Sequence, residues 1–394
     1  MGYIQGDYLI MATRKVAVVN RTNFKNYGSV LQCFALCKAI EQLGYESEII
    51  WQGGSIAKNY DFRLGKLFAS IITLITHPSL ISQARKSLHS VRKENITAIT
   101  EQLFERFVEE NINRKTATKR ELKDLALTYY DKCVCGSDQI WNPNTLYVDP
   151  LLFLRFAPKE KRVAYAPSLG SDSIPSYNKN KMKKFISDIP CVSIREKQGQ
   201  KLLYELCGIE YPIVADPTLL FDMPFWTKYS IEMPFDDYVL CYFLEEPELS
   251  VQSNIVKYIT ELKKRVIIIN SPLEFVSNHS LSERVDCGPS EFLGLVRNAS
   301  QIITDSYHGM LFSIIFEKDF VSIERNYSEH NQSSRQLSIL EILGLQERYS
   351  VGGTIDDTLS SIDYSVVSKK IEHFRFESLE YLKRSFGEID NGMH

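Results

Sequence analysis

Residues 15–50 read KVAVVNRTNFKNYGSVLQCFALCKAIEQLGYESEII, and their pattern indicates the fold class. KVAVVN, at 15–20, is a short β-branched run typical of a strand, and a polar loop that contains glycine follows it. Apolar residues then recur at helical spacing through VLQCFALCKAIEQL, and Gly44 stands where such a helix ends, before SEII begins another strand. A strand, a helix and a second strand in this order form a βαβ unit, so we predict a parallel sheet.

The same alternation returns in the second half of the chain. Strand-like runs at 238–244 (YVLCYFL), 266–270 (VIIIN), 301–305 (QIITD) and 319–324 (DFVSIE) are separated by helical patterns. A chain of 394 residues is too long for one ordinary core. We therefore expect an α/β protein with two Rossmann-like, doubly wound domains that face a cleft, one over 14–220 and one over 235–350. Residues 216–234 would link them, and a helix over 362–386 could pack back on the first domain.

Composition and motifs exclude several function classes. The 46 basic and 49 acidic side chains nearly cancel, and a net charge of −3 gives no electrostatic footprint for nucleic acid. The eight cysteines are scattered and lack the paired spacing of a zinc site, which is typical of reduced thiols in a cytosolic protein. The phosphate-loop, dinucleotide-binding, H-E-x-x-H and G-x-S-x-G signatures are absent from the sequence. NTPase, NAD-dependent and common hydrolase functions thus lose their usual support.

The chain also lacks the usual membrane signals. MGYIQGDYLIMATRK, at the start, does not have the basic-then-apolar pattern of a signal peptide, and no run reaches the ~18 apolar residues that a spanning helix needs. Residues 67–81 come partway, and a basic flank follows with Arg85, Lys86, His89, Arg92 and Lys93. Such a segment could lie on an anionic membrane surface, although a partly buried helix with a solvated basic neighbour is favoured. We expect a cytoplasmic protein, and leave open a peripheral contact with the inner face of the cell membrane.

Polar residues gather where the predicted strands end. In doubly wound sheets, ligands bind at the carboxyl ends of the strands, so this position is informative. For any single residue, a turn or a helix cap is an adequate explanation. We expect such a turn at Asp216, which precedes Pro217, and a place on a helix face for Gln32. The polar residues at strand ends are Asn26, Tyr27, Gly28, Ser137, Asp138, Gln139, Trp141, Asn142, Ser168, Arg195, Glu196 and Asp305 to His308.

His308 and Arg195 are the strongest candidates for a binding site. A histidine at the junction of a strand and a helix lies beside free backbone N–H groups and the positive end of the helix dipole, which together favour an anion. Arginine adds a planar fork suited to carboxylate or phosphate. The pair therefore predicts a pocket for a small, doubly anionic ligand. The alternatives are a hydrogen-bonded core histidine for His308 and a surface salt bridge with Glu196 for Arg195.

The motifs resemble those of the polysaccharide pyruvyl transferases. The resemblance rests on NYGSVLQCFALCKAIEQLGY, CGSDQIWNP, VAYAPSLG, SIRE, ADPTLL and GPSEFLGLVRNASQIITDSYHGMLFSIIF, with SSRQLSILEILG after them. These segments follow the family order over roughly residues 15–345, and GSDQ-x-W-N with TDS-[FY]-HG is a specific combination. The resemblance implies a fold similar to the GT-B glycosyltransferases, with the acceptor on the first domain and the donor on the second.

The resemblance also implies the chemistry. The family transfers a pyruvyl group from phosphoenolpyruvate to two hydroxyls of a sugar, which forms a cyclic ketal and releases phosphate. By the resemblance, His308 and Arg195 hold phosphoenolpyruvate, with Tyr307 beside them. The family commonly has Arg-Asp where this chain has Arg195 followed by Glu196, so we expect a change in geometry rather than a loss of activity.

Roles follow for the remaining candidates. His308 would bind phosphate or donate the proton, and Asp138 would act as the base for the sugar hydroxyl. Trp141 could stack on the sugar, although a packed tryptophan is an equal alternative. The expected donor-binding residues are Arg195, His308, Tyr307, Ser306, Gly309 and Arg335, of which Arg335 could equally be a surface residue. The expected acceptor-binding residues are Asn26, Tyr27, Gly28, Ser137, Gln139, Trp141, Asn142 and Ser168.

The expected function is thus a pyruvyl transferase of capsule or cell-envelope polysaccharide biosynthesis. The acceptor would be a sugar or lipid-linked oligosaccharide, with galactose and a 4,6-ketal suggested by the family alone. No cofactor is required besides the donor substrate; a divalent metal is left open, although no ligand cluster in the sequence points to one. A nucleotide-sugar glycosyltransferase of the GT-B type and a non-catalytic glycan-binding relative are the alternatives. The oligomeric state is not indicated.

Overall fold

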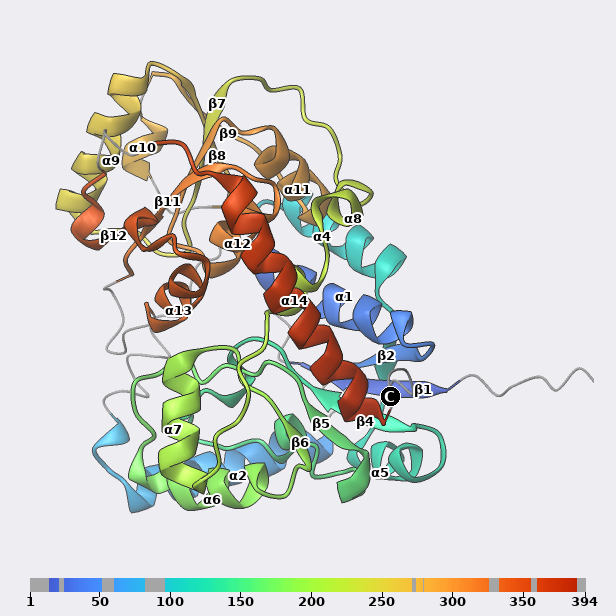
Figure 1. Cartoon of the computed structure of the whole chain (residues 1–394). Helices are drawn as coiled ribbons and strands as arrows, with labels where there is room; N and C mark the ends of the chain where they lie inside the picture. The colour runs from blue at the N-terminus through green and yellow to red at the C-terminus, as the bar shows by residue number, and fades with distance from the viewer. Residues whose placement is uncertain are drawn as a thin grey trace, which may run out of the picture.

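A computed structural model of the chain contains two parallel six-stranded sheets, one from each half of the sequence (Figure 1). The structure describes residues 14–20, 25–51, 60–81, 96–270, 274–278, 280–325, 333–355 and 360–387. In the first sheet the strand order is β3-β2-β1-β4-β5-β6. Its strands are β1 (Lys15–Val19), β2 (Glu46–Trp51), β3 (Arg114–Thr116), β4 (Lys132–Cys135), β5 (Arg162–Ala164) and β6 (Cys191–Val192).

The second sheet repeats the same topology. Its order is β12-β11-β10-β7-β8-β9, which is the first order read from the opposite edge. Its strands are β7 (Tyr238–Tyr242), β8 (Arg265–Ile268), β9 (Ser282–Arg284), β10 (Gln301–Thr304), β11 (Asp319–Ile323) and β12 (Tyr349–Ser350). Both sheets thus have the doubly wound Rossmann order, and the predicted fold class is confirmed. Their switch points lie between β1 and β4 and between β7 and β10, where ligands bind in such folds.

Helices cover the sheets and fill part of the boundary between them. The helices of the first half are α1 (Tyr27–Gln42), α2 (Tyr60–Thr76), α4 (Ala98–Asn111), α5 (Lys119–Thr128), α6 (Ser176–Ile186) and α7 (Lys197–Cys207). The later helices are α8 (Met223–Thr227), α9 (Leu249–Leu262), α10 (Glu274–Ser277), α11 (Pro289–Asn298), α12 (Tyr307–Ile315), α13 (Ser334–Leu343) and α14 (Tyr364–Phe386). None of the helices in the described ranges is long and apolar enough to cross a membrane.

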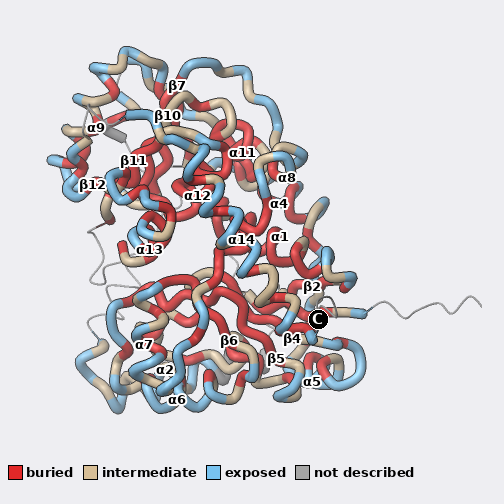
Figure 2. The backbone as a smooth tube through the Cα atoms, viewed as in Figure 1, coloured by how far each residue is buried: buried red, intermediate tan, exposed pale blue. Residues whose placement is uncertain are grey.

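Helix α1 belongs to both halves of the molecule. It follows β1 in sequence, yet it also packs against α11 and α12 of the second half, so it is buried along almost its whole length (Figure 2). Tyr27, at its start, stacks on Phe292 of α11 with ring centroids 4.7 Å apart, and its hydroxyl donates to the carbonyl of Cys287. One apolar cluster therefore runs through both halves and fixes them against each other.

The connection between the sheets is packed rather than loose. Residues 216–234 contain the short 3₁₀ helix η4 (Pro217–Leu220) and α8. Trp226 is fully buried, and its indole contacts the rings of Phe34 and Phe312. Because Trp226 packs against a ring from each half of the chain, the connecting segment is part of the core and not a flexible linker.

Helix α14 crosses from the second sheet to the first (Figure 1). At its start the hydroxyl of Tyr364 donates to the carbonyl of Lys318, and near its end the ring of Phe386 packs on Tyr45. In between, the guanidinium of Arg375 donates to the carbonyl of Leu219. The last helix thus contacts both halves and braces the connection from outside.

Candidate active site between the two sheets

The junction of β10 and α12 places His308 at the boundary of the two halves. Ser306 is the N-cap of α12, and its hydroxyl oxygen accepts a hydrogen bond from the backbone N–H of Gly309. The apolar residues that follow bury the rest of the helix in the core. His308 is therefore held in the first turn, where the backbone N–H groups have no partners within the helix. The side chain of His308 is 8% exposed.

The imidazole of His308 reaches the first half of the chain at α1. A β carbon built on Gly28 would lie only 2.1 Å from Nδ1 of His308, far inside any real contact distance. Only glycine allows the two helices to approach in this way. Asn26, just before, caps α1 by accepting from the N–H of Ser29. The NYG motif thus ends a loop, starts a helix and makes room for the histidine.

Asp216 joins the histidine to Arg195. One carboxylate oxygen of Asp216 accepts from the N–H and hydroxyl of Thr218, so the predicted turn is present. The other oxygen accepts from Nη1 of Arg195 at 2.6 Å and lies 3.5 Å from Nε2 of His308. Asp216 was expected to have only the first role. The local sequence predicts the cap at Thr218, but it gives no sign that the second carboxylate oxygen accepts a hydrogen bond from an arginine.

Arg195 connects three elements of the site. Its Nη2 donates to Asp138 at 3.1 Å, and its guanidinium lies 4.4 Å from the ring centroid of Tyr307. The side chain is only 1% exposed, and its Nε is 3.9 Å from the equally buried Glu196. The alternative of a surface salt bridge between Arg195 and Glu196 is therefore wrong, because both groups are inside the protein. Arg195 is a buried cation between two carboxylates.

The two carboxylates are held in their charged form. Burial alone would raise the pKa of Asp216, but the charges of His308 and Arg195 outweigh it and keep the pKa well below the usual range. The pKa of Asp138 is lowered in the same way, against burial, by Arg195, His308 and Arg335. Asp138 sits at a backbone φ of 64°, uncommon for a residue other than glycine, and its side chain is 27% exposed. It is thus the more accessible of the two.

Arg335 closes the cluster from α13. Its guanidinium lies 3.8 Å from Asp138, and the amide oxygen of Gln139, when turned toward it, accepts from both terminal nitrogens at 2.8 Å. The alternative that Arg335 is a surface residue is wrong, since it is buried. Burial lowers its pKa to about 10, with Arg195 adding repulsion. A desolvated cation of this kind gains strongly from a bound anion.

The buried Glu196 accepts hydrogen bonds from the loop that follows β5. One of its oxygens accepts from the hydroxyl of Ser168 and from the N–H of Leu169. Burial raises its pKa, although Arg195 opposes the rise. The serine expected to contact the acceptor thus has its hydroxyl engaged with this carboxyl group.

Several other candidates have structural partners. Ser137 is fully buried, and its hydroxyl donates to the carbonyl of Ala166. Gln32, expected on a helix face, is also fully buried, and its amide oxygen accepts from Asn20 and from the N–H of Ser137. Gly309 lies where a β carbon would be 2.6 Å from the hydroxyl of Thr304. Tyr27 lies in the shared apolar core, with its ring and hydroxyl both occupied.

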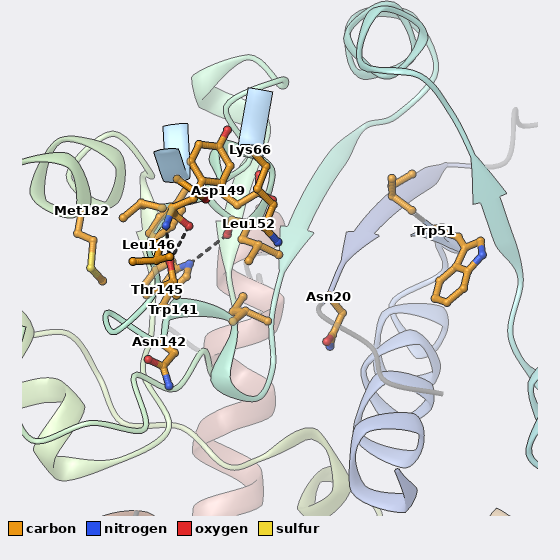
Figure 3. A pocket seen from close by; sticks show the side chains of 16 residues that line it. Asn20, Trp51, Lys66, Trp141, Asn142, Thr145, Leu146, Asp149, Leu152 and Met182 are labelled. Atoms are coloured by element: carbon orange, nitrogen blue, oxygen red, sulfur yellow. Dashed lines mark hydrogen bonds between the residues drawn. The ribbon is translucent and has the colours of Figure 1, made fainter. Parts of the chain in front are cut away.

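A hollow of about 490 Å³, drawn in Figure 3, lies at the carboxyl edge of the first sheet and is distinct from the charged cluster. The 3₁₀ helix η1 (Gln139–Trp141) separates the two, because Asp138 precedes it while Trp141 and Asn142 line the hollow. Trp141 stacks on Phe153, with its N–H donating to the carbonyl of Leu152, so it forms a packed wall. The other polar or aromatic side chains that line the hollow include Asn20, Trp51, Lys66, Ser70, Thr145, Tyr147 and Asp149.

The structure thus gathers five of the predicted residues into one cluster: His308, Arg195, Tyr307, Asp138 and Arg335. Asp216 belongs with them. Trp141 and Asn142 lie on the far side of η1, at the hollow. Among the described residues, no three or more histidine, cysteine or carboxylate side chains are placed to hold a metal ion.

Comparison with known proteins places the chain in a family. A family model described as polysaccharide pyruvyl transferase matches residues 26–327, which include every residue of the cluster except Arg335. Among proteins with curated descriptions, no sequence relative was found.

Solved structures share the overall architecture at low sequence identity. A glycosyltransferase from Rickettsia africae is 10% identical, with a TM-score of 0.50, and the match covers 96% of this chain and 100% of that one. The UDP-GlcNAc 2-epimerase of Methanocaldococcus jannaschii is 13% identical, with a TM-score of 0.48 and coverage of 94% and 98%. MurG of Acinetobacter baumannii is 7% identical, with a TM-score of 0.46 and coverage of 95% and 100%. At these identities the likeness concerns the fold alone, and the GT-B type of fold rests on the two doubly wound sheets and on the Rickettsia africae structure.

Proposed function

Because this chain belongs to the polysaccharide pyruvyl transferase family, we propose that it transfers the pyruvyl group of phosphoenolpyruvate to two hydroxyls of a glycan sugar and releases phosphate. The observation that carries the proposal is the cluster around Arg195. It joins the switch points of both sheets and combines buried cations with ionised carboxylates, and all of its residues except Arg335 lie within the region that the family model matches.

The donor would bind where the cations converge. Phosphoenolpyruvate carries a phosphate and a carboxylate, and the first turn of α12, His308 and Arg335 offer an N-terminal dipole and positive charge to such a ligand. Arg195 is bound by Asp216 on its buried side and by Asp138 on its more exposed side. An incoming anion would therefore reach Arg195 by taking the place of Asp138, and would leave the bond to Asp216 intact.

This exchange suits the chemistry. His308 would donate a proton to the methylene carbon of phosphoenolpyruvate, so that positive charge develops at C2. A sugar hydroxyl adds to C2 and loses its proton to Asp138, which the donor has released from Arg195. Phosphate then leaves with the C–O bonding electrons, stabilised by Arg335. The second hydroxyl adds to C2 and gives its proton to the departing phosphate, and the proton that Asp138 took returns to His308, which restores both residues. A carboxylate of low pKa is sufficient as the base, because a hydroxyl that is adding to a cationic carbon is strongly acidified.

We propose that the acceptor glycan occupies the hollow at the edge of the first sheet and extends past η1, so that its reacting sugar reaches the donor at the cluster. The walls of the hollow combine the aromatic rings of Trp51, Trp141 and Tyr147 with the polar side chains of Asn142 and Asp149, a mixture that suits a sugar with an apolar face and hydroxyl edges. We propose galactose, as a 4,6-ketal, in a capsule or cell-envelope precursor. The reaction would take place in the cytoplasm, where phosphoenolpyruvate is produced, with no cofactor besides the donor.

The decisive experiment incubates the purified protein with phosphoenolpyruvate and a panel of glycan precursors. We expect phosphate release only when an acceptor is present, and an acceptor mass increased by one pyruvyl ketal. A protein that shows no turnover but is stabilised by a nucleoside diphosphate, and not by phosphoenolpyruvate, would be a glycosyltransferase instead. Saccharide binding that His308→Ala and Arg195→Ala leave unchanged, without turnover, would indicate a non-catalytic glycan-binding protein.

A further inference from the structure

Helix α2 presents an apolar face to solvent, whereas the basic flank that the sequence has at 85–93 lies outside the described residues. From Lys66 to Ile81 no side chain is buried. Large apolar side chains at i, i+1, i+4, i+5 and i+8 share one side of the helix. These residues, which we call the α2 face, are Leu67, Phe68, Ile71, Ile72 and Ile75, each between 43% and 71% exposed. Contiguous apolar surface of this kind is unusual on a protein in water and marks a site of contact.

The other side of α2 is the inner side. Lys66 and Ser70 line the hollow at the edge of the first sheet, and His77, just after the helix, contacts the ring of Tyr177 in α6. Because Met182 of α6 lines the same hollow, the two helices border one cavity. Figure 1 shows both at the outer end of the first sheet, away from the second sheet. The polar side of α2 therefore packs against the rest of the protein, and the α2 face points outward.

Helix α6 adds positive charge beside this apolar surface. Residues 173–187 contain four lysines and no acidic residue, and residues 66–81 contain none either. Lys181 packs over the ring of Tyr147. The remaining three, Lys179, Lys183 and Lys184, are exposed. Lys179 and Lys183 are four residues apart and therefore neighbours on one side of α6, and Lys184 follows Lys183 around the helix. Of the two acidic residues that flank this range, Asp188 is neutralised by Arg155 and Arg162, and Asp172 is exposed at the start of the segment.

We propose that the α2 face and the exposed lysines of α6 together dock the protein on an anionic lipid bilayer. The apolar side chains would enter the boundary between headgroups and acyl chains, while the lysines would attract the negative surface. The hollow lies between these two helices, so docking brings its border to the membrane surface. An acceptor sugar carried on a lipid would be presented there, if the proposed function holds; the docking itself does not depend on it.

The composition favours a bilayer over a protein partner. Contact surfaces between proteins are depleted in lysine and enriched in tyrosine, tryptophan, phenylalanine, methionine and arginine, and of these enriched types the α2 face contains only Phe68. The α2 face consists of leucine, isoleucine and phenylalanine, with lysine at its margin. This is the pattern of helices that lie in a membrane interface. A second copy of the chain, which would bring its own lysines to the same place, meets like charge at that margin.

Sedimentation with lipid vesicles tests the proposal. We expect the full chain to sediment with vesicles of phosphatidylcholine and phosphatidylglycerol, and much less with phosphatidylcholine alone, with binding weakened by added sodium chloride. The double variant Phe68→Ser, Ile72→Ser should weaken vesicle binding by about tenfold or more, because two large apolar side chains that the bilayer would bury are then missing. Lys179→Ser, Lys183→Ser and Lys184→Ser together should remove the preference for the anionic lipid.

Matched control variants change exposed residues on other helices, α14 and α5. Phe376, on α14, has the same exposed fraction as Phe68, 63%, so Phe376→Ser should leave vesicle binding unchanged. Lys119, Arg120 and Lys123 of α5 are exposed as well, and replacing them by serine should leave the lipid preference intact. Vesicle binding that the α2 variants do not alter would overturn the proposal. Absence of vesicle binding would also overturn it. If sedimentation velocity then showed a dimer that Phe68→Ser dissociates, the α2 face would be an interface between two copies of the chain.

Discussion

The imidazole of His308 lies directly against the α carbon of Gly28, with no room for even a methyl group between them. The contact joins the helix after β1 to the helix after β10, so the switch points of the two sheets meet at one residue pair. The position of His308 toward Asp216 and Arg195 therefore depends on a glycine that carries no chemistry of its own.

Gly28→Ala should damage activity more than stability. The new methyl group must displace the ring of His308, and overpacking of this kind costs about 1–3 kcal/mol of the free energy of unfolding. Phosphate release should fall further than the stability loss explains, because the ring leaves its place beside Asp216. Urea unfolding and acceptor-dependent phosphate release measure the two effects. Gly208→Ala is the control, since its methyl group meets nothing within 4 Å and adds only the strain of a positive φ.

His308→Ala should lower kcat/KM for phosphoenolpyruvate by roughly 10²-fold or more, the loss typical of one positioned catalytic group. Arg195→Ala should cost at least as much, because it also leaves Asp138 and Asp216 without their shared cation. Steady-state phosphate release at varied donor concentration measures both. His373→Ala, on the exposed surface of α14, should be indistinguishable from the wild type. Full activity of His308→Ala would remove the residue from the mechanism.

Asp216→Asn should change how stability depends on pH. The pKa of Asp216 is depressed in the folded state, so its charge stabilises the fold above the unfolded pKa, and that contribution is lost as the pH falls. The wild type should therefore lose free energy of unfolding progressively below about pH 5, and the variant should lose less over the same range. At neutral pH the variant should be less stable by about 3–5 kcal/mol, because the buried cation Arg195 keeps only Asp138, the more exposed of its two carboxylate partners. Urea unfolding at several pH values measures the slopes, and equal slopes would contradict the ion pair.

The general form of the site could be predicted from the sequence, while its internal bonding could not. His308 and Arg195 stood out because each follows a strand, and strand ends meet at one edge of a parallel sheet. Asp216 did not stand out, because a turn that it caps at Thr218 already explains an aspartate at this position. Its second carboxylate oxygen accepts a hydrogen bond from Arg195, which is distant in the sequence. Tyr27 was misleading for the same reason. A tyrosine in a polar loop motif gives no sign that Phe292 will cover its ring.

Asp138→Asn should separate donor binding from turnover. In the structure Asp138 occupies the more exposed side of Arg195, where we propose that the donor binds, so the carboxylate and the donor compete for one cation. Neutralising it should leave the affinity for phosphoenolpyruvate unchanged or higher, while turnover falls by about 10²-fold because the base is lost. Calorimetric titration with phosphoenolpyruvate and single-turnover kinetics measure the two quantities. Weaker donor binding with unchanged turnover would show that Asp138 holds the site together and is not the base, and a lowered melting temperature alone would assign it a purely structural role.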